Sequence, residues 1–368
     1  MKFNSLVLLW FFLAQAAGGY AHASTPPQQC SNLLSASTPN ETELQHYFSQ
    51  LAFAIERNQE AFRKILLQFN NSRGTDYEIK QAINTLRGAY AQEKQYLLTT
   101  KPLNNVAVYG STNIPLYTLV MHGLIPASIS QNVWFKTPTL TRQIYIQLLN
   151  EIKNQIEHPW IERLHLLTEA SDVQYDAFQR KYVLGMNHKG NKYLRAPSEV
   201  VLFTGNPQTG IEMIKSSQDK LARKPVSLDW SGKQIYLLFG SGHNPQVISK
   251  NMDEYLFDQT VDDVLQNILV NAGQDCISPS LYFIDQAIEK TFYQKLLARV
   301  GELAPQDITP LNNDPNALKS AIEYKTKYAS HLINPETASI NESTRLVSPH
   351  IFAFKLSDLK TVPIKQHY

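Results

Sequence analysis

The sequence predicts an α+β protein, rich in helix, in which an N-terminal helical hairpin precedes a mixed domain with a small sheet. Two long amphipathic stretches near the N-terminus are separated by a short polar break, a pattern typical of paired helices. Further along, the apolar run from Val200 to Phe203 is followed by a polar turn at residues 204–207, which indicates a buried strand. The runs that could pair with this strand lie far away in the chain, near Val106, Ile235 and Ile351.

The composition is that of a folded protein with balanced charge. A length of 368 residues suggests one large domain or two ordinary ones, and a hydrophobic content of 43% supplies a real core. Lys and Arg total 34 and Asp and Glu total 32, so the whole-chain charge gives no case for a nucleic-acid or anionic-lipid partner.

The first 23 residues have the order of a secretory signal. Lys2 supplies a positive charge, 6–13 is a short apolar block, and Ala21-His22-Ala23 resembles a cleavage site. The apolar block is too short to remain as a membrane span, although an uncleaved anchor is the alternative. We therefore expect a signal peptide at 1–23, export to the periplasm or the extracellular space, and no membrane association after the signal is removed.

The remaining elements follow from apolar spacing and from turn residues. Residues 24–39 predict a flexible lead-in, because Ser, Thr, Pro and Gln dominate them. Apolar residues at three- and four-residue steps predict helices over 40–70 and 76–98, which form the hairpin of a segment spanning 40–100. Lys101-Pro102 marks the start of the α+β domain, 101–368. Within it we expect strands near 105–112, 200–203, 233–239 and 350–355, a β-hairpin over 173–194, and helices near 114–122, 140–156, 160–167, 208–221, 261–270, 280–299 and 316–331.

The chain has two cysteines, Cys30 and Cys276. In an oxidising compartment they could form one disulfide, although sequence cannot show that they lie close enough. The alternative is a nucleophilic Cys276, but its sequence neighbours give no sign of thiolate activation. Two cysteines cannot build a structural zinc site, and the ten histidines are scattered without carboxylates at ligand spacing, so no metal site is predicted.

One set of motifs suggests a family. The turn Val108-Tyr109-Gly110-Ser111-Thr112 is followed by His122-Gly123-Leu124, and Glu342 stands just ahead of the last expected strand. This pattern resembles the opening and the late glutamate of ADP-ribosyltransferase-type domains over about 105–364, with Gly110 where that family has His or Arg. The resemblance implies NAD as cofactor and nicotinamide release as the reaction. It also implies that Glu342 is the catalytic residue, stabilising a cationic transition state. The cofactor-binding residues that it implies are Tyr109, Ser111, Thr112 and Thr204.

Two classes of function follow from these patterns. The first is an exported effector or toxin that resembles ADP-ribosyltransferases, either active or degenerate. The second is a non-catalytic secreted interaction protein, in which the helical hairpin docks on a protein partner. A hydrolase that uses dispersed Asp, Ser and His residues is a third possibility, and the sequence leaves open whether the chain is an enzyme.

Overall fold

The computed structural model describes residues 39–99, 101–169, 174–190, 192–205, 207–222, 234–240, 245–273, 279, 281–311 and 317–357. The expected signal peptide, the expected disulfide between Cys30 and Cys276 and nearly all of the expected lead-in lie outside these residues. The chain forms two compact units, each built from two stretches of sequence. The first unit is Met1–Ile65 with Glu78–Phe239, and the second is Leu66–Tyr77 with Gly240–Tyr368. The domain boundaries expected at 23, 39 and 100 remain predictions.

The first unit is organised around a five-stranded sheet. Its strand order is β3-β2-β1-β4-β5. The pairs β1–β2, β2–β3 and β1–β4 are all parallel, with Val106 of β1 lying between Val133 of β2 and Val200 of β4. The strands are β1 (Leu103–Tyr109), β2 (Ser130–Lys136), β3 (Leu164–Leu167), β4 (Val200–Gly205) and β5 (Ile235–Gly240). Parallel strands need crossover connections, so each is followed by helical structure before the next.

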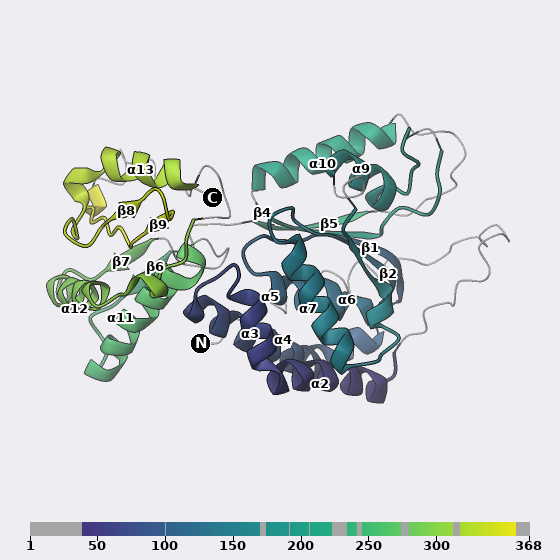
Figure 1. Cartoon of the computed structure of the whole chain (residues 1–368), viewed down its shortest axis with the longest axis horizontal. Coiled ribbons are helices and arrows are strands. Elements are labelled where there is room, and N and C mark those ends of the chain that lie inside the picture. Colours follow the sequence, from purple (N-terminus) through teal and green to yellow (C-terminus); the bar gives the residue numbers. More distant parts are fainter. Residues whose placement is uncertain are drawn as a thin grey trace. The chain divides into compact units, whose positions relative to one another are not determined.

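Helices cover both faces of this sheet (Figure 1). On one face the ring of Phe135 in β2 contacts Tyr145 of α7, with ring centroids 5.1 Å apart. On the other face the ring of Trp134 contacts Tyr182, at 5.2 Å. Trp134 and Phe135 are neighbours in one strand, so their side chains point to opposite faces of the sheet. Their contacts therefore show that both faces are covered. The first face carries α5 (Pro115–Thr118), the π-helical turn η2 (Leu119–Leu124), α6 (Ile125–Ala127) and α7 (Arg142–Gln155), and the second carries α9 (Tyr175–Phe178), the π-helical turn η4 (Gln179–Val183) and α10 (Pro207–Ala222).

Apart from residues 66–77, which belong to the second unit, the N-terminal helices are part of this first unit rather than a separate hairpin in front of it. They are α2 (Glu41–Arg57), α3 (Gln59–Leu66) and α4 (Ser72–Thr99). Asn40 and Glu43 form a capping box at the start of α2. The helix packs against α7, and the buried Tyr47 hydroxyl donates to the carbonyl of Leu124 at 2.9 Å. The expected fold class was therefore wrong: the protein is α/β, with a Rossmann-like parallel sheet between helices.

The error has a local cause. The strand β2 begins with the polar residues Ser130-Gln131-Asn132 and was not expected at all, while β3 was taken for the end of a helix after Pro159. Without these two strands the alternation of strand and helix is hidden. The β-hairpin expected at 173–194 is instead helical over α9 and η4, followed by an isolated bridge between Met186 and Tyr193. The strand expected at 350–355 is only a bridge from Phe352 to Leu332.

The second unit has its own core. Helices α11 (Glu254–Leu269) and α12 (Glu289–Gly301) pack together, with the rings of Phe257 and Phe292 in edge contact at 6.0 Å. Asp253 caps the start of α11 by accepting from the Leu256 amide at 2.8 Å. The other elements are the parallel pair β6 (Gln246–Ile248) and β7 (Tyr282–Ile284), the antiparallel pair β8 (Ile340–Asn341) and β9 (Leu346–Val347), helix α13 (Ala317–Lys327) and the 3₁₀ turns η5 (Val270–Gly273), η6 (Pro305–Asp307) and η7 (Ala329–His331). One more 3₁₀ turn, η3 (Ile161–Arg163), belongs to the first unit.

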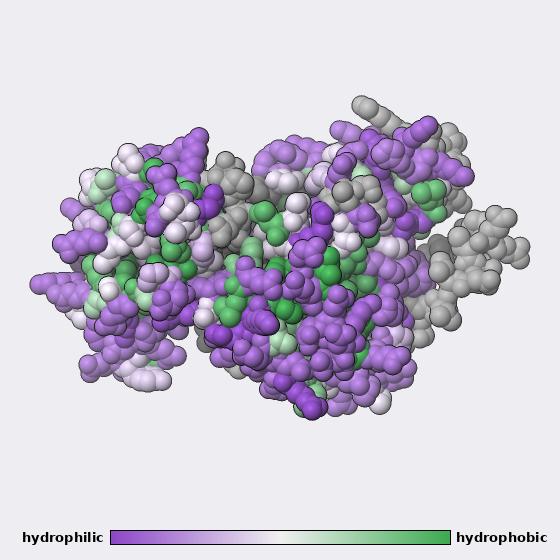
Figure 2. Space-filling model, in the orientation of Figure 1, coloured by the Kyte–Doolittle hydropathy of each residue, from purple (hydrophilic) through white to green (hydrophobic). Residues whose placement is uncertain are grey.

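The outer surface of the helices is mainly polar. Figure 2 shows hydrophilic residues dominating the surface over α2, with hydrophobic residues in scattered groups. In the ranges that the structure describes, no helix is both long enough and apolar enough to cross a bilayer.

Candidate functional site

The carboxyl ends of β1 and β4 form the centre of the candidate site. Tyr109 of β1 lies opposite Phe203 of β4 at these ends. After β1 the chain continues to the strands on one side of the sheet, and after β4 it continues to β5 on the other side. From β1 the order runs outward through β2 and β3 on one side, and through β4 and β5 on the other. In open parallel sheets, ligands bind at the carboxyl ends of the strands at this switch point.

Three of the residues predicted to bind cofactor lie at this edge. The buried Ser111 hydroxyl lies 2.7 Å from that of Thr118, and the Ser111 carbonyl accepts from the Tyr145 hydroxyl at 2.8 Å. These contacts fix the turn that follows β1. Thr112 follows in the same turn and is half-buried. Thr204 is the last residue but one of β4. The structure therefore brings Ser111, Thr112 and Thr204 to one edge of the sheet.

Tyr109, the fourth residue, is packed inside the protein. Its ring lies 4.8 Å from that of Phe178 and 5.8 Å from that of Phe203, centroid to centroid. Burial raises the pKa of its hydroxyl well above the usual value, so the group stays neutral. Tyr109 thus forms part of the hydrophobic core beneath this edge of the sheet.

The turn from β4 into α10 has the features of an anion-binding turn. Gly205 ends the strand, Pro207 begins the helix, and Gly210 follows one turn later. A Cβ on Gly210 would lie 3.1 Å from the Leu238 side chain, so the missing side chain lets α10 lie close to the sheet. The positive end of α10 begins directly after β4, where its amides can bind phosphate oxygens. Two glycines, Gly205 and Gly210, at a junction of strand and helix are the sequence signal for a dinucleotide-binding turn that was missed.

His122 supports the same edge from the π-helical turn η2. The Nδ1 atom of His122 lies 3.4 Å from the Thr204 hydroxyl. Burial lowers the pKa of His122 to about 4, so the ring is neutral near neutral pH. π-Helical turns occur often near functional sites. We interpret His122 as a residue that positions Thr204.

Glu342, the predicted catalytic residue, lies in the second unit, whereas the four predicted cofactor-binding residues lie in the first. It is exposed in the turn between β8 and β9, where the Asn341 side chain accepts from the Thr344 amide at 3.1 Å. Its catalytic assignment depended on the ADP-ribosyltransferase resemblance.

The end of β2 carries candidate residues that were not predicted. Lys136 ends the strand, and Thr141 and Arg142 stand at the start of α7. They were missed because β2 itself was missed. The signal available in the sequence was a short apolar run, Val133-Trp134-Phe135, followed by a cation and a Thr-Pro turn.

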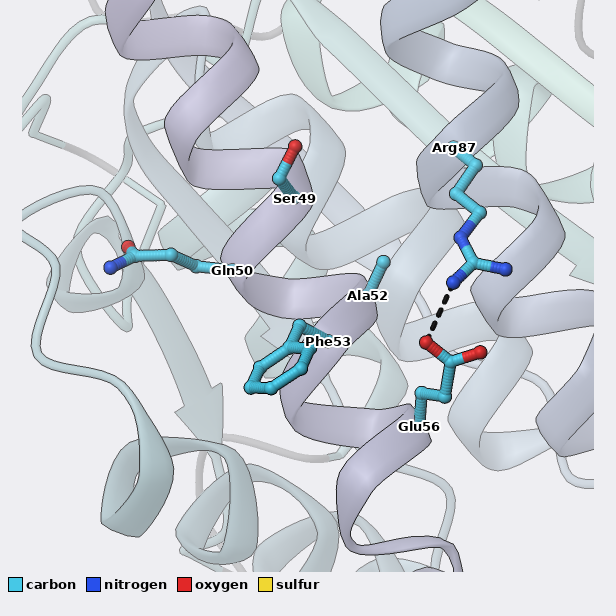
Figure 3. A pocket seen from close by; sticks show the side chains of 6 residues that line it. All are labelled: Ser49, Gln50, Ala52, Phe53, Glu56 and Arg87. Atoms are coloured by element: carbon cyan, nitrogen blue, oxygen red, sulfur yellow. Dashed lines mark hydrogen bonds and ion pairs between the residues drawn. The ribbon is translucent and has the colours of Figure 1, made fainter.

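A hollow on the helical surface is not part of this site. It has a volume of about 510 Å³ and is lined by Ser49, Gln50, Ala52, Phe53, Glu56 and Arg87 (Figure 3). Arg87 and Glu56 already form an ion pair at 2.6 Å across its edge. None of these residues belongs to a strand end. Among the described residues, no group of three or more His, Cys, Asp or Glu side chains is arranged to hold a metal ion.

A parallel sheet of this strand order, with a glycine-containing turn and a helix start at its switch point, is typical of the doubly wound class of folds, many of which bind dinucleotides. The chain belongs to the aldehyde dehydrogenase family, whose family model matches residues 40–353.

Individual relatives agree with this assignment. The chain is 25% identical over 300 residues to the 4,4'-diapolycopene-4,4'-dial dehydrogenase of Cytobacillus firmus, covering 76% of this chain and 57% of that protein. The chain thus spans a little over half the length of this curated relative. The fold is similar to 1-pyrroline-5-carboxylate dehydrogenase from Thermus with bound NAD (TM-score 0.64, 13% identity, 85% of this chain and 60% of that one). It is also similar to an NADP complex of glyceraldehyde-3-phosphate dehydrogenase from Methanocaldococcus jannaschii (TM-score 0.59, 19% identity, 86% of this chain and 67% of that one).

These findings correct several expectations. The ADP-ribosyltransferase resemblance was wrong, and with it the effector or toxin role. The non-catalytic interaction protein is overturned as well, because the relatives are aldehyde dehydrogenases. The same finding overturns the predicted signal peptide and export. NAD was expected through the wrong family, but aldehyde dehydrogenases do use NAD(P).

Proposed function

We propose that this protein is an NAD(P)-dependent dehydrogenase that oxidises an aldehyde to a carboxylic acid. The observation that carries the proposal is the family match over residues 40–353, on a sheet with the dinucleotide-binding strand order. Because the chain spans only part of its relatives' length, the activity is a proposal that experiment must test.

The residues at the switch point fit a dinucleotide. The start of α10 and the backbone of Gly205 would bind the pyrophosphate. The hydroxyls of Ser111, Thr112 and Thr204 would line the same edge, and the buried Tyr109 would support it from below. NAD(P), when bound, supplies the acceptor for the hydride that leaves the substrate.

The chemistry requires a nucleophile, because an aldehyde carbon must carry an added group before hydride loss can give an acid derivative. Cys276 is the only thiol within the residues that match the family, since Cys30 lies outside them. As a thiolate, Cys276 would add to the carbonyl carbon to give a tetrahedral thiohemiacetal. Hydride loss then leaves a thioester, and water releases the acid and restores the thiol. Cys276 itself is outside the described residues.

The turn after β1 offers a group to stabilise the substrate oxygen. Asn113 is half-buried there, just before Pro115 at the start of α5. Its neutral amide can donate a hydrogen bond to the carbonyl oxygen, which becomes negative when the thiolate adds. Asn113 is therefore our candidate for this role.

The test is turnover by the purified full chain with NAD⁺ or NADP⁺ and a panel of aldehydes, followed by the absorbance of the reduced nicotinamide. We expect Cys276→Ser to lower kcat by about a thousandfold or more, because a hydroxyl is a much weaker nucleophile. The matched variant Cys30→Ser should keep wild-type turnover. Full activity in Cys276→Ser would refute the nucleophile, and no turnover of any aldehyde by the wild type would refute the activity.

A further inference from the structure

The turn between β1 and α5 is held by a buried tyrosine of α7. The Tyr145 side chain is completely buried, and its hydroxyl donates to the carbonyl of Ser111 at 2.8 Å. The same hydroxyl contacts the hydroxyl of Thr118, which lies 2.7 Å from that of Ser111. Burial raises the pKa of Tyr145, so its hydroxyl keeps its proton and remains a donor. Tyr145 therefore connects the turn after β1 to the helix that follows β2.

The first residue of this turn is fixed by β2 as well. The Gly110 amide donates to the Lys136 carbonyl at 3.0 Å. A Cβ on Gly110 would lie 2.5 Å from the ring of Phe135, so only glycine lets the turn lie this close to β2. The Phe135 ring also contacts the Tyr145 ring, with centroids 5.1 Å apart. The start of the turn is thus fixed by contacts with both β2 and α7.

The far end of the turn is fixed by a different helix. Glu78 of α4 accepts from the Leu116 amide at 2.6 Å and from the Tyr117 amide at 3.2 Å. Asn113 lies half-buried between the two fixed points, two residues after Ser111 and three residues before Leu116. Because residues 112–115 alone join these points, the backbone at Asn113 has few conformations open to it.

We propose that Tyr145 is a positioning residue: its hydrogen bond to the Ser111 carbonyl fixes the turn that carries the Asn113 amide to the substrate oxygen. The inference rests on the proposed dehydrogenase function, in which Asn113 stabilises the oxygen that becomes negative. Such a donor is effective only when it is aligned before the reaction begins. A displacement of about 1 Å in a group of this kind can lower the rate about a hundredfold.

Tyr145→Phe tests the inference, because it removes the hydroxyl and keeps the ring against Phe135. At saturating cofactor, we expect kcat and kcat/KM for the aldehyde to fall equally, by about tenfold, since the lost alignment matters in the transition state. The matched control is Tyr47→Phe, which removes another buried hydroxyl that donates to a carbonyl, that of Leu124 at 2.9 Å. It should destabilise the fold to a similar extent and leave both kinetic constants unchanged.

A double-mutant cycle shows whether Tyr145 acts through Asn113. We expect Asn113→Ala to lower kcat/KM by about a hundredfold or more, measured at high enzyme concentration. Adding Tyr145→Phe to Asn113→Ala should then cause no further loss, because the group that it positions is already absent. A purely structural role for Tyr145 would instead give the same tenfold loss in both backgrounds.

Hydrogen exchange gives a readout that does not depend on activity. In Tyr145→Phe, the amides of residues 111–117 should exchange about tenfold faster than in the wild type, because the turn opens more often. In Tyr47→Phe the same amides should exchange at the wild-type rate.

The remaining outcomes contradict different statements. If an active wild type and Tyr145→Phe have the same kcat/KM, or if the two losses in the cycle are independent, the inference is wrong and the dehydrogenase proposal stands. Unchanged exchange of residues 111–117 in Tyr145→Phe also overturns the inference alone. If the wild type oxidises no aldehyde, the dehydrogenase proposal fails and the inference fails with it.

Discussion

At the scale of single residues, the carboxyl-end edge of the sheet depends on a histidine that must stay neutral. His122 is only 4% exposed, and its Nδ1 atom contacts the Thr204 hydroxyl. Charging such a ring costs free energy, because burial disfavours the imidazolium form. The stability of the first unit should therefore depend on pH in a way that can be traced to this one side chain.

The sign of that dependence follows from the pKa of His122. Burial lowers it from 6.5 to about 4, so between these values the unfolded chain binds more protons than the folded one. The free energy of unfolding should thus rise with pH across this window, by up to about 3 kcal/mol, and level off above it. Urea unfolding of the wild type and of His122→Gln at several pH values measures the effect. The difference between the two proteins should shrink as the pH falls.

The comparison isolates His122, because the other histidines are present in both proteins. Burial also lowers the pKa of His158, His165 and His350, so the wild-type curve alone would not be diagnostic. Stability curves for the wild type and His122→Gln that run parallel over the whole pH range would contradict the prediction.

At the scale of elements, helix α5 receives its cap from a distant part of the chain. Its N-cap residue, Ile114, has no side chain that can accept a hydrogen bond. Instead, Glu78 of α4 accepts from the Leu116 amide at 2.6 Å and from the Tyr117 amide at 3.2 Å. A carboxylate also interacts favourably with the positive end of a helix. Glu78 thereby fixes the helix that follows the turn after β1.

Removing this cap should destabilise the protein. We expect Glu78→Ala to lower the free energy of unfolding by about 2 to 4 kcal/mol, because one buried and one half-buried amide lose their acceptor. Glu78→Gln keeps an acceptor oxygen and should lose about half as much. Denaturant unfolding measures both variants. An alanine variant as stable as the wild type would show that water or another group caps α5 equally well.

The same scale shows what could be predicted from sequence. The strands around Val106, Val200 and Ile235 were expected because each is a compact apolar run. The strands β2 and β3 were not, because Ser130-Gln131-Asn132 is polar and Leu164-His165-Leu166-Leu167 is too short to show a period. Such segments become strands through their neighbours in the sheet.

The site follows the same pattern. Ser111, Thr112 and Thr204 were chosen through the ADP-ribosyltransferase resemblance, which was wrong. They nevertheless lie together, because they follow or end parallel strands whose carboxyl ends meet at one edge of the sheet. Lys136 and Arg142 could not be chosen until β2 was known. The family was misread because a short turn motif around Gly110 was given more weight than the Gly205-to-Gly210 spacing.

At the scale of the whole molecule, the second unit is assembled from two distant stretches of chain. The segment Leu66–Tyr77 belongs to it together with residues 240 onward. Asn71 holds this segment in place: its side-chain amide donates to the carbonyls of Asp307 at 2.8 Å and Leu269 at 3.3 Å. Its Oδ1 atom accepts from the Gly74 amide at 2.7 Å, which also caps α4.

We expect Asn71→Ala to lower the free energy of unfolding by about 2 to 3 kcal/mol, because it removes a cap and leaves buried carbonyls unsatisfied. Chemical denaturation is the measurement. The matched control is Asn150→Ala, an exposed asparagine of α7, which should change stability by no more than about 0.5 kcal/mol. Equal stabilities for the two variants would show that Asn71 does not hold the segment.

The strand order also governs how the chain reaches this structure. β1 pairs with β2, which follows it after a short crossover. Its other neighbour is β4, and in that pair Val106 lies opposite Val200, which is 94 residues further along the chain. Long loops close slowly, so the partial sheet of β3, β2 and β1 should form first. Until β4 pairs with it, the edge of β1 is exposed and unpaired. An open apolar edge can pair with another chain. During folding, aggregation should therefore compete with the arrival of β4, and it should increase with protein concentration.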